Sequence, residues 1–176
     1  MPQLMMHWKN DGVPAERPVF SEGLSMCTLP ELENGVDKWL DIVQYGLSDE
    51  RKDFSYYKAA MLDVPWYEEE KCYFITYRGE AVATITVICD QDTKKGNVHM
   101  VACCPECRGM GIGNLMVGIA VHTLKTAGMQ TASLLTDDFR IPAIKTYLKG
   151  GFQPDLSTED FVQRWDAIYR KIGITA

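Results

Sequence analysis

The sequence predicts one α/β domain built on a mixed sheet, and three observations carry this prediction. Its 176 residues, 46% of them hydrophobic, are enough for a single sizeable core. Apolar runs rich in Ile, Val and Thr at residues 72–77, 81–89 and 97–104 are typical of neighbouring antiparallel strands. A run with helical spacing then leads to another short apolar strand, and a strand reached through a helix runs parallel to the one before it.

The first half of the chain is expected to supply an extension, two helices and a hairpin. Residues 1–23 contain three prolines and mixed charges, so we expect an N-terminal extension before a single domain at 24–176. Polar residues at 78–80 separate two strand-like runs and predict a hairpin. The elements expected before it are a strand at 24–29, a helix at 35–46 that ends at Gly46, and a helix at 54–61.

The second half is expected to alternate helices with a strand. Leu115, Met116, Ile119, Ala120 and Leu124 have helical spacing, and Gly128 is expected to end that helix. The expected elements after it are a strand at 131–136, a helix between Pro142 and Gly150, and a helix at 161–172 after a capping box at 157–160.

Composition excludes several classes of partner. The net charge is −6 and the pI is near 5.1, whereas a nucleic-acid-binding surface is basic, so we expect no nucleic-acid partner. An acidic protein attracts cationic small molecules such as amines more readily. No apolar run approaches the roughly 20 residues that span a bilayer, and the start lacks the pattern of a secretory signal. We therefore expect a cytoplasmic protein without membrane contact.

The stretch CCPECRGMGIG at residues 103–113 has two interpretations. Its left end contains a C-x-x-C pair, Cys104 and Cys107, which suggests zinc or redox chemistry. A structural zinc site needs a second pair or two nearby histidines, and His7, His99 and His122 are far apart in the sequence. We therefore expect no metal site.

The right end of the stretch is a glycine turn before a helix, the general device for holding a phosphate. No Lys-Ser or Lys-Thr follows the glycines, so the loop is not that of a nucleotide hydrolase. Position 114 is Asn where the dinucleotide-binding fingerprint needs Gly, although Asp137 lies near the place of its acidic ribose partner. The preceding antiparallel strands also argue against a dinucleotide fold.

The remaining spacing, Arg108-x-x-Gly111-x-Gly113, resembles the acyl-CoA loop of the GNAT superfamily of N-acetyltransferases. The later segment RIPAIKTYLKGGF, at residues 140–152, is similar to a second block of that family, in which Asn-x-x-Ala leads to Tyr and then Gly-Phe. Both blocks occur in the family's order, within residues 97–155. The resemblance implies a twisted sheet of about six to seven strands with helices on both faces.

The resemblance also implies a binding site for acetyl-CoA. Gly111 and Gly113 lack Cβ atoms, so the loop can wrap closely around a pyrophosphate. Two neighbouring strands of the family splay apart, and the exposed amides would be those of Val101, as oxyanion donor, and Cys103. The expected cofactor-binding residues are Val101, Cys103, Arg108, Gly109, Met110, Gly111, Ile112, Gly113, Asn114, Arg140 and Tyr147. Asn114 is alternatively the N-cap of the helix.

Candidate catalytic groups follow from the same resemblance. Tyr147 matches the family's tyrosine, which protonates the departing thiolate. His99 is expected on the same strand face as Val101 and is a candidate general base. Glu68, Glu69 and Glu70 are alternatives. Arg140 stands where many members have Asn, which leaves open whether it meets a phosphate of the cofactor.

The resulting interpretation is an enzyme that transfers an acetyl group from acetyl-CoA to a primary amine of a small molecule or peptide by direct attack. A non-catalytic acyl-CoA-binding module is an alternative, and a Cys-based metal or redox protein is a further one. The sequence leaves open the acceptor amine, the general base, the acyl-chain preference and whether the chain forms a homodimer.

Overall fold

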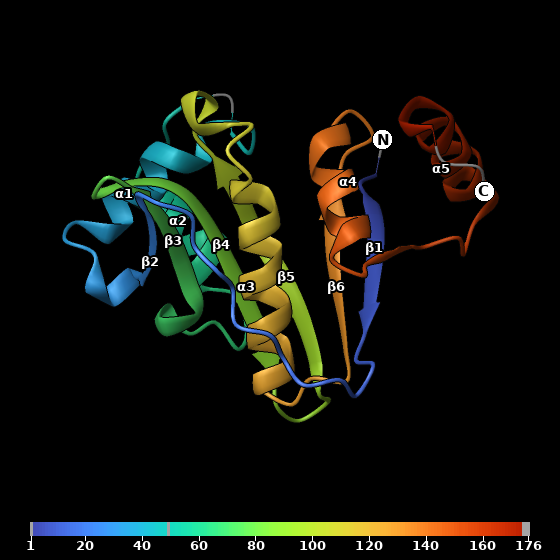
Figure 1. The fold of residues 1–176 in the computed structure, drawn as a ribbon, viewed down its shortest axis with the longest axis horizontal. Coiled ribbons are helices and arrows are strands. Elements are labelled where there is room, and N and C mark those ends of the chain that lie inside the picture. The colour runs from blue at the N-terminus through green and yellow to red at the C-terminus, as the bar shows by residue number, and fades with distance from the viewer. Residues whose placement is uncertain (1, 49, 174–176) are drawn as a thin grey trace.

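The computed structural model describes residues 2–48 and 50–173, and these form one seven-stranded sheet in the order β2-β3-β4-β5-β6-β1-β7 (Figure 1). All neighbouring strands are antiparallel except β5 and β6, which run parallel as expected. The strands are β1 (Leu4–Lys9), β2 (Leu24–Thr28), β3 (Cys72–Tyr77), β4 (Glu80–Asp90), β5 (Lys95–Cys103), β6 (Thr131–Thr136) and β7 (Gln153–Pro154). The structure therefore confirms the mixed α/β fold.

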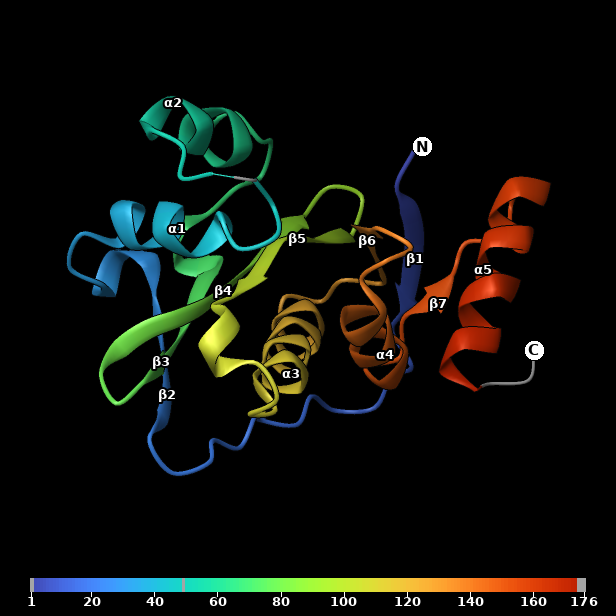
Figure 2. The same ribbon diagram turned by 90° about the horizontal axis from the view of Figure 1, so that it is seen from above.

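Helices cover both faces of this sheet (Figure 2). The first face carries α1 (Gly35–Val43) and α2 (Phe54–Tyr57), and the second carries α3 (Ile112–Thr126) and α4 (Ile141–Lys149). Helix α5 (Glu159–Ile172) lies beside β7 at the end of the sheet. Each face has its own apolar core: Trp39, Tyr57 and Phe74 are buried on the first, and Met116 and Ile144 on the second. In the part of the chain that the structure describes, no helix is long and apolar enough to cross a membrane.

Three local expectations need correction. The helix that starts at Phe54 continues after Tyr57 as a π-helix, Lys58–Leu62, in which the Asp63 amide donates to the Lys58 carbonyl. Helix α1 already ends at Val43, and Gly46 lies in the turn beyond it. The cap of α5 is Thr158, whose hydroxyl accepts a hydrogen bond from the Phe161 amide. This single side-chain cap replaces the capping box expected at 157–160, because position N3 is Phe161, which has no side-chain acceptor.

The expected N-terminal extension contains an inner strand. Residues 4–9 form β1, which pairs with β6 along its length and with β7 at two positions. Leu4, Met6 and Trp8 are buried in the core of the α3/α4 face. The chain then crosses the outer side of α3 before it reaches β2 on the far edge of the sheet (Figures 1 and 2). This crossing segment, residues 10–23, contacts α3 through a hydrogen bond that Lys125 Nζ donates to Asp11 Oδ1 at 2.7 Å.

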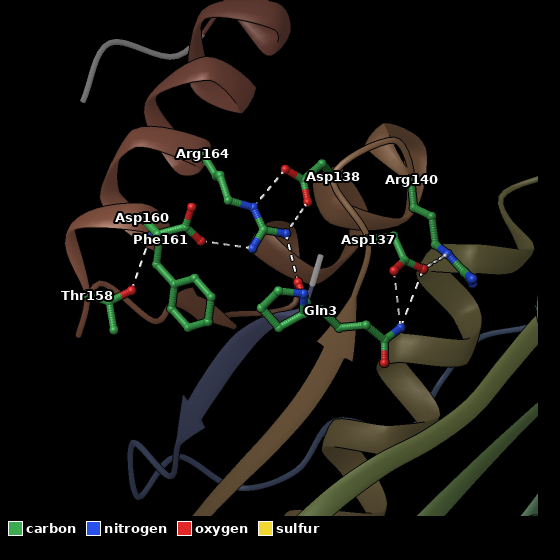
Figure 3. A network of polar contacts seen from close by, with 9 residues as sticks. Gln3, Asp137, Asp138, Arg140, Thr158, Asp160, Phe161 and Arg164 are labelled. Carbon is green, nitrogen blue, oxygen red and sulfur yellow. Dashed lines mark hydrogen bonds and ion pairs between the residues drawn. The ribbon is translucent and has the colours of Figure 1, made fainter.

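An ion-pair cluster attaches α5 to the end of β6 (Figure 3). Arg164 on α5 donates from Nε to Asp138 at 3.0 Å and from Nη1 to Asp160 at 3.2 Å. Its Nη2 donates to the Pro2 carbonyl at 3.0 Å. The guanidinium is largely buried, and it holds the pKa of the Asp138 carboxyl below its usual range.

Replacing Arg164 with Gln is expected to lower the free energy of unfolding by about 1–3 kcal/mol at pH 7, since hydrogen bonds to charged groups are lost. A depressed carboxyl pKa stabilises the folded state above the unfolded pKa, and this contribution disappears as pH falls through the folded pKa. Urea unfolding measures the free energy of unfolding of the wild-type protein and of Arg164→Gln at pH 7 and at about pH 3. The difference between the two free energies should be smaller at the lower pH. The matched control is Arg170→Gln, which changes an exposed arginine on the same helix. An equal Arg164→Gln effect at both pH values would contradict this account.

Candidate functional site

The site begins where β5 and β6 part. Their pairing covers only Lys95 to Val98, although β5 continues to Cys103. The Cys104 amide donates to the Val82 carbonyl on the β4 side at 2.8 Å. Successive amides of a strand point to opposite edges, so the amides of Val101 and Cys103 face the β6 side. They lie beyond the last β5–β6 pair, where no ladder partner is present in the described chain.

A β-bulge at Met100 changes which side chains share a face of β5. His99 lies opposite Thr86, whereas Ala102 lies opposite Thr84. Because Thr84 and Thr86 are two residues apart on β4, His99 and Ala102 point to the same face. Met100 has a φ of +51°, and the extra residue shifts the alternation by one.

The expectation that His99 and Val101 share a face is therefore wrong. Val101 packs against the core under α3 and α4, whereas Ala102 lies in the core under α1 and α2. His99 points with Ala102 to the α1/α2 face and donates from Nε2 to the Ala60 carbonyl in the π-helix at 2.8 Å. Burial lowers the pKa of His99, so the imidazole is neutral at pH 7, with Nδ1 as its acceptor.

The glycine loop connects β5 to α3. A short 3₁₀ turn, Pro105–Cys107, is followed by Gly109 and Gly111, whose φ angles are +85° and +79°. Gly111 is the N-cap of α3, and no side chain caps the first amides of this helix. Asn114 lies inside α3 and is therefore not its N-cap. Arg108 is exposed and forms no ion pair or hydrogen bond through its side chain within the described residues.

The glycine loop leaves open space beside its backbone. A Cβ built on Gly109 or Gly111 would meet no atom within 4 Å, so the protein leaves open space on that side of the backbone. Gly113 instead faces Thr146 of α4, with 3.4 Å from a built Cβ to Oγ1. The uncapped amides at the start of a 15-residue helix favour an anion. A groove of about 270 Å³ adjoins the loop, lined by Pro18, Val19, Ser21, Met110, Gly111 and Asn114.

The C-x-x-C pair does not form one unit. Cys104 is buried in the core under α1 and α2, whereas Cys107 is buried in the core under α3 and α4. Burial raises the pKa of the Cys104 thiol to about 11 and also raises that of Cys107. Within the described residues, no three His, Cys, Asp or Glu side chains are grouped so that they could hold a metal ion. The left end of the glycine stretch thus serves packing.

Tyr147 lies on the buried side of α4. Its side chain is 6% exposed, and its ring packs edge-on against Phe152 with the centroids 6.3 Å apart. Burial raises the pKa of its phenol to about 12, while the charge of Arg140 acts in the opposite direction. The hydroxyl forms no hydrogen bond within the described part of the chain. A neutral phenol without a protein partner is able to donate its proton to a ligand.

Asp137 and Gln3 contact each other beside Arg140, and neither was expected at an acyl-CoA site, since Asp137 was considered only as the ribose partner of a dinucleotide-binding loop. Asp137 Oδ2 lies 2.7 Å from Arg140 Nε, and Gln3 Nε2 donates to the same carboxylate at 3.3 Å and 3.4 Å (Figure 3). Asp137 directly follows β6, at the end where β5 and β6 have separated. A carboxylate at the end of such a strand is a sequence signal that could have indicated this residue. Gln3 is recognisable only once β1 is known to lie next to β6.

The three glutamates at 68–70 are exposed. Glu68 pairs with Lys71 across the 3₁₀ turn Glu69–Lys71. No contact in the described chain connects these carboxylates with Tyr147 or the glycine loop, so the structure gives them no share in this arrangement.

Comparison with known proteins agrees with this geometry. The model of the acetyltransferase (GNAT) family matches residues 39–152. The mycothiol acetyltransferase of Streptomyces griseus is 26% identical over 140 residues, which cover 77% of this chain and 45% of the relative. That of Streptomyces bingchenggensis is 30% identical over 88 residues, which cover 50% and 29%. The chain thus spans less than half the length of these curated relatives.

Solved structures show the same fold. A GCN5-related N-acetyltransferase from Sphaerobacter thermophilus has a TM-score of 0.68 at 18% identity, covering 88% of this chain and 50% of that one. The ribosomal-protein-S18-alanine N-acetyltransferase from Escherichia coli has a TM-score of 0.60 at 15% identity, covering 74% and 77%. At such low identity these structures inform the fold alone.

Proposed function

This chain belongs to the acetyltransferase (GNAT) family, and from that membership we propose that it transfers an acetyl group from acetyl-CoA to a primary amine. The observation that carries the proposal is the combination of two features at the end of β5. The strand leaves its neighbour after Val98, and a glycine loop then leads into an uncapped helix start. Together they offer amides to a thioester and to a pyrophosphate.

Acetyl-CoA would lie along these amides. The backbone of residues 109–114 would hold the pyrophosphate, and the exposed Arg108 side chain would meet a phosphate. The pantetheine arm would enter the gap between β5 and β6, where the Cys103 amide faces it. We propose that this domain includes β1, because β1 lies within the sheet, between β6 and β7.

Transfer would proceed by direct attack of the amine on the thioester carbon. The C–N bond forms, and the carbonyl oxygen gains negative charge that the Val101 amide stabilises. The C–S bond then breaks, the thiolate leaves with the electron pair, and the Tyr147 hydroxyl protonates the sulfur. Coenzyme A and an amide are the products.

His99 remains our candidate for the base that takes the amine proton. Its Nε2–H is bound to the Ala60 carbonyl, which leaves the Nδ1 lone pair to accept a proton. It points to the α1/α2 face, whereas Tyr147 lies under α4 on the opposite face. Because His99 and Tyr147 lie on different faces of the sheet, the proton that His99 takes from the amine would not pass directly to Tyr147.

The acceptor is proposed to be the amine of a small molecule or a peptide. The names of the curated relatives favour a small molecule of the mycothiol type. A mass-spectrometric screen tests this with acetyl-CoA and a panel of mycothiol-type amines, polyamines, aminoglycosides, amino acids and peptide N-termini. Acetylation of one class above the uncatalysed rate, lost on Tyr147→Phe, supports the proposal. Calorimetric binding of acetyl-CoA without acetylation of any amine would favour the acyl-CoA-binding module instead.

A further inference from the structure

Arg140 and Tyr147 share one face of α4. Arg140 precedes the first residue of the helix and Tyr147 follows it by seven positions, which is close to two full turns. Ile144, between them on the same face, is fully buried. Arg140, the N-cap residue, therefore stands at the N-terminal end of the helix on whose buried side Tyr147 lies.

Several contacts fix the position of Arg140. Its backbone amide donates to the Asp137 carbonyl at 2.9 Å, which closes a turn between β6 and α4. Its side chain pairs with the Asp137 carboxylate, and both side chains are only 25% exposed. Gln3, the residue before β1, donates to both oxygens of that carboxylate (Figure 3). The position of the charge is therefore set by three elements of the fold.

The neighbouring ion pair offers a natural comparison. Asp138 comes next in the same loop, yet it pairs with Arg164 on α5 (Figure 3). That pair attaches a helix and has no contact with Tyr147. Among the described residues, Arg140 is the one charged group whose field acts on the Tyr147 phenol, and it lowers the phenol's pKa against the effect of burial.

We propose that Asp137 is a positioning residue that holds the Arg140 guanidinium where its charge strengthens Tyr147 as the acid of the leaving-group step. The inference rests on the proposed function and deepens it. When the C–S bond breaks, the thiolate takes the electron pair and the phenol proton, and the phenolate remains until solvent returns a proton. Arg140 stabilises that phenolate, which a buried site would otherwise disfavour.

The first test measures the phenol itself and needs no acceptor amine. Tyr147→3,5-difluorotyrosine lowers the phenol pKa through the electron-withdrawing fluorines, so that absorbance can follow this titration apart from those of the other tyrosines. In the full chain, adding Arg140→Gln is expected to raise the phenol pKa by about one unit or more, the usual effect of removing a nearby opposite charge. Arg140→Lys should restore most of the difference, and Asp137→Asn should cause a smaller rise. An unchanged titration in Arg140→Gln would overturn the proposal.

The second test asks whether Arg140 acts through Tyr147 during turnover. With acetyl-CoA and the panel amine that the wild-type protein acetylates fastest, Arg140→Gln should lower kcat by about three- to tenfold. In the Tyr147→Phe background the same change should have almost no effect, because residues that act as a unit are not additive. The KM for acetyl-CoA should stay within about twofold.

Two results separate this proposal from its alternatives. The first is a rise in the KM for acetyl-CoA on Arg140→Gln that is equal with Tyr and with Phe at position 147. That result would show that Arg140 binds a cofactor phosphate, and it would overturn the proposal. Asp138→Asn is the matched control, since it removes the neighbouring pair and should leave kcat and the phenol titration unchanged in folded protein. A protein that acetylates no amine would refute the proposed function, whereas the difluorotyrosine titration would still decide the Arg140 effect.

Discussion

Replacing Tyr147 with Phe is expected to lower turnover by about 10² to 10⁴, the usual effect of a positioned general acid. The substitution keeps the ring that packs against Phe152 and removes only the hydroxyl. That hydroxyl has no hydrogen-bond partner in the described chain, so the free energy of unfolding should change little. The decrease is expected toward the lower end of this range, because a thiol with a pKa near 8.5 leaves fairly easily without assistance.

The measurement compares kcat with the calorimetric affinity for acetyl-CoA. A general acid lowers kcat without weakening binding, whereas a purely packing residue changes neither in this conservative variant. Wild-type turnover in Tyr147→Phe would assign the residue to the core, and the proton donor would have to be sought elsewhere. Equal losses in binding and turnover would indicate a role in holding the cofactor.

Replacing Gly111 with Val is expected to weaken acetyl-CoA binding by about 10²-fold or more, since two or more charge-assisted hydrogen bonds are worth about 1.5–3 kcal/mol each. The side chain would project into the open space beside the loop, where the pyrophosphate has to approach. A β-branched residue also disfavours the φ of +79° that Gly111 adopts. The first amides of α3 would then no longer point together at one anion.

Gly128→Val is the matched control for this strain. Gly128 follows the other end of α3, has a φ of +73°, and also faces open space. Both variants should lose similar stability in urea, but only Gly111→Val should lose affinity in a calorimetric titration. Equal affinities in the two folded variants would show that the loop does not hold the pyrophosphate.

The sequence predicted the elements whose pattern is local. Strand β6 agrees with its expected bounds, and α3 begins directly after the glycine turn and ends before Gly128. The strand β1 was not expected, because three prolines within residues 1–23 suggested an extension. Its signal was nevertheless present, since Leu4, Met6 and Trp8 alternate with more exposed residues. A six-residue strand is stabilised by the strands with which it pairs, and here these lie far along the chain. The local sequence pattern holds no information about such partners.

The site shows the same division. The glycine loop could be identified from spacing, because the backbone conformation at Gly111 depends on the residue itself. The sheet face to which His99 points could not be predicted from spacing, because a bulge at Met100 shifts the alternation of side chains by one residue. Asp137 and Gln3 are 134 positions apart in the chain. Their contact depends on β1 lying beside β6, so only the folded structure shows it.

The place of β1 also has a consequence for how the chain folds during synthesis. Residues 4–9 are synthesised long before their ladder partners at 131–136. In the interval, an apolar strand with two unpaired edges has no sheet to join, and such segments are prone to aggregate. The β1–β6 part of the sheet, beside which Gln3 contacts Asp137, can therefore form only after residues 131–137 have been translated. Folding should be slow for a domain of this size, because the contacts of β1 with β6 and β7 join residues far apart in the sequence.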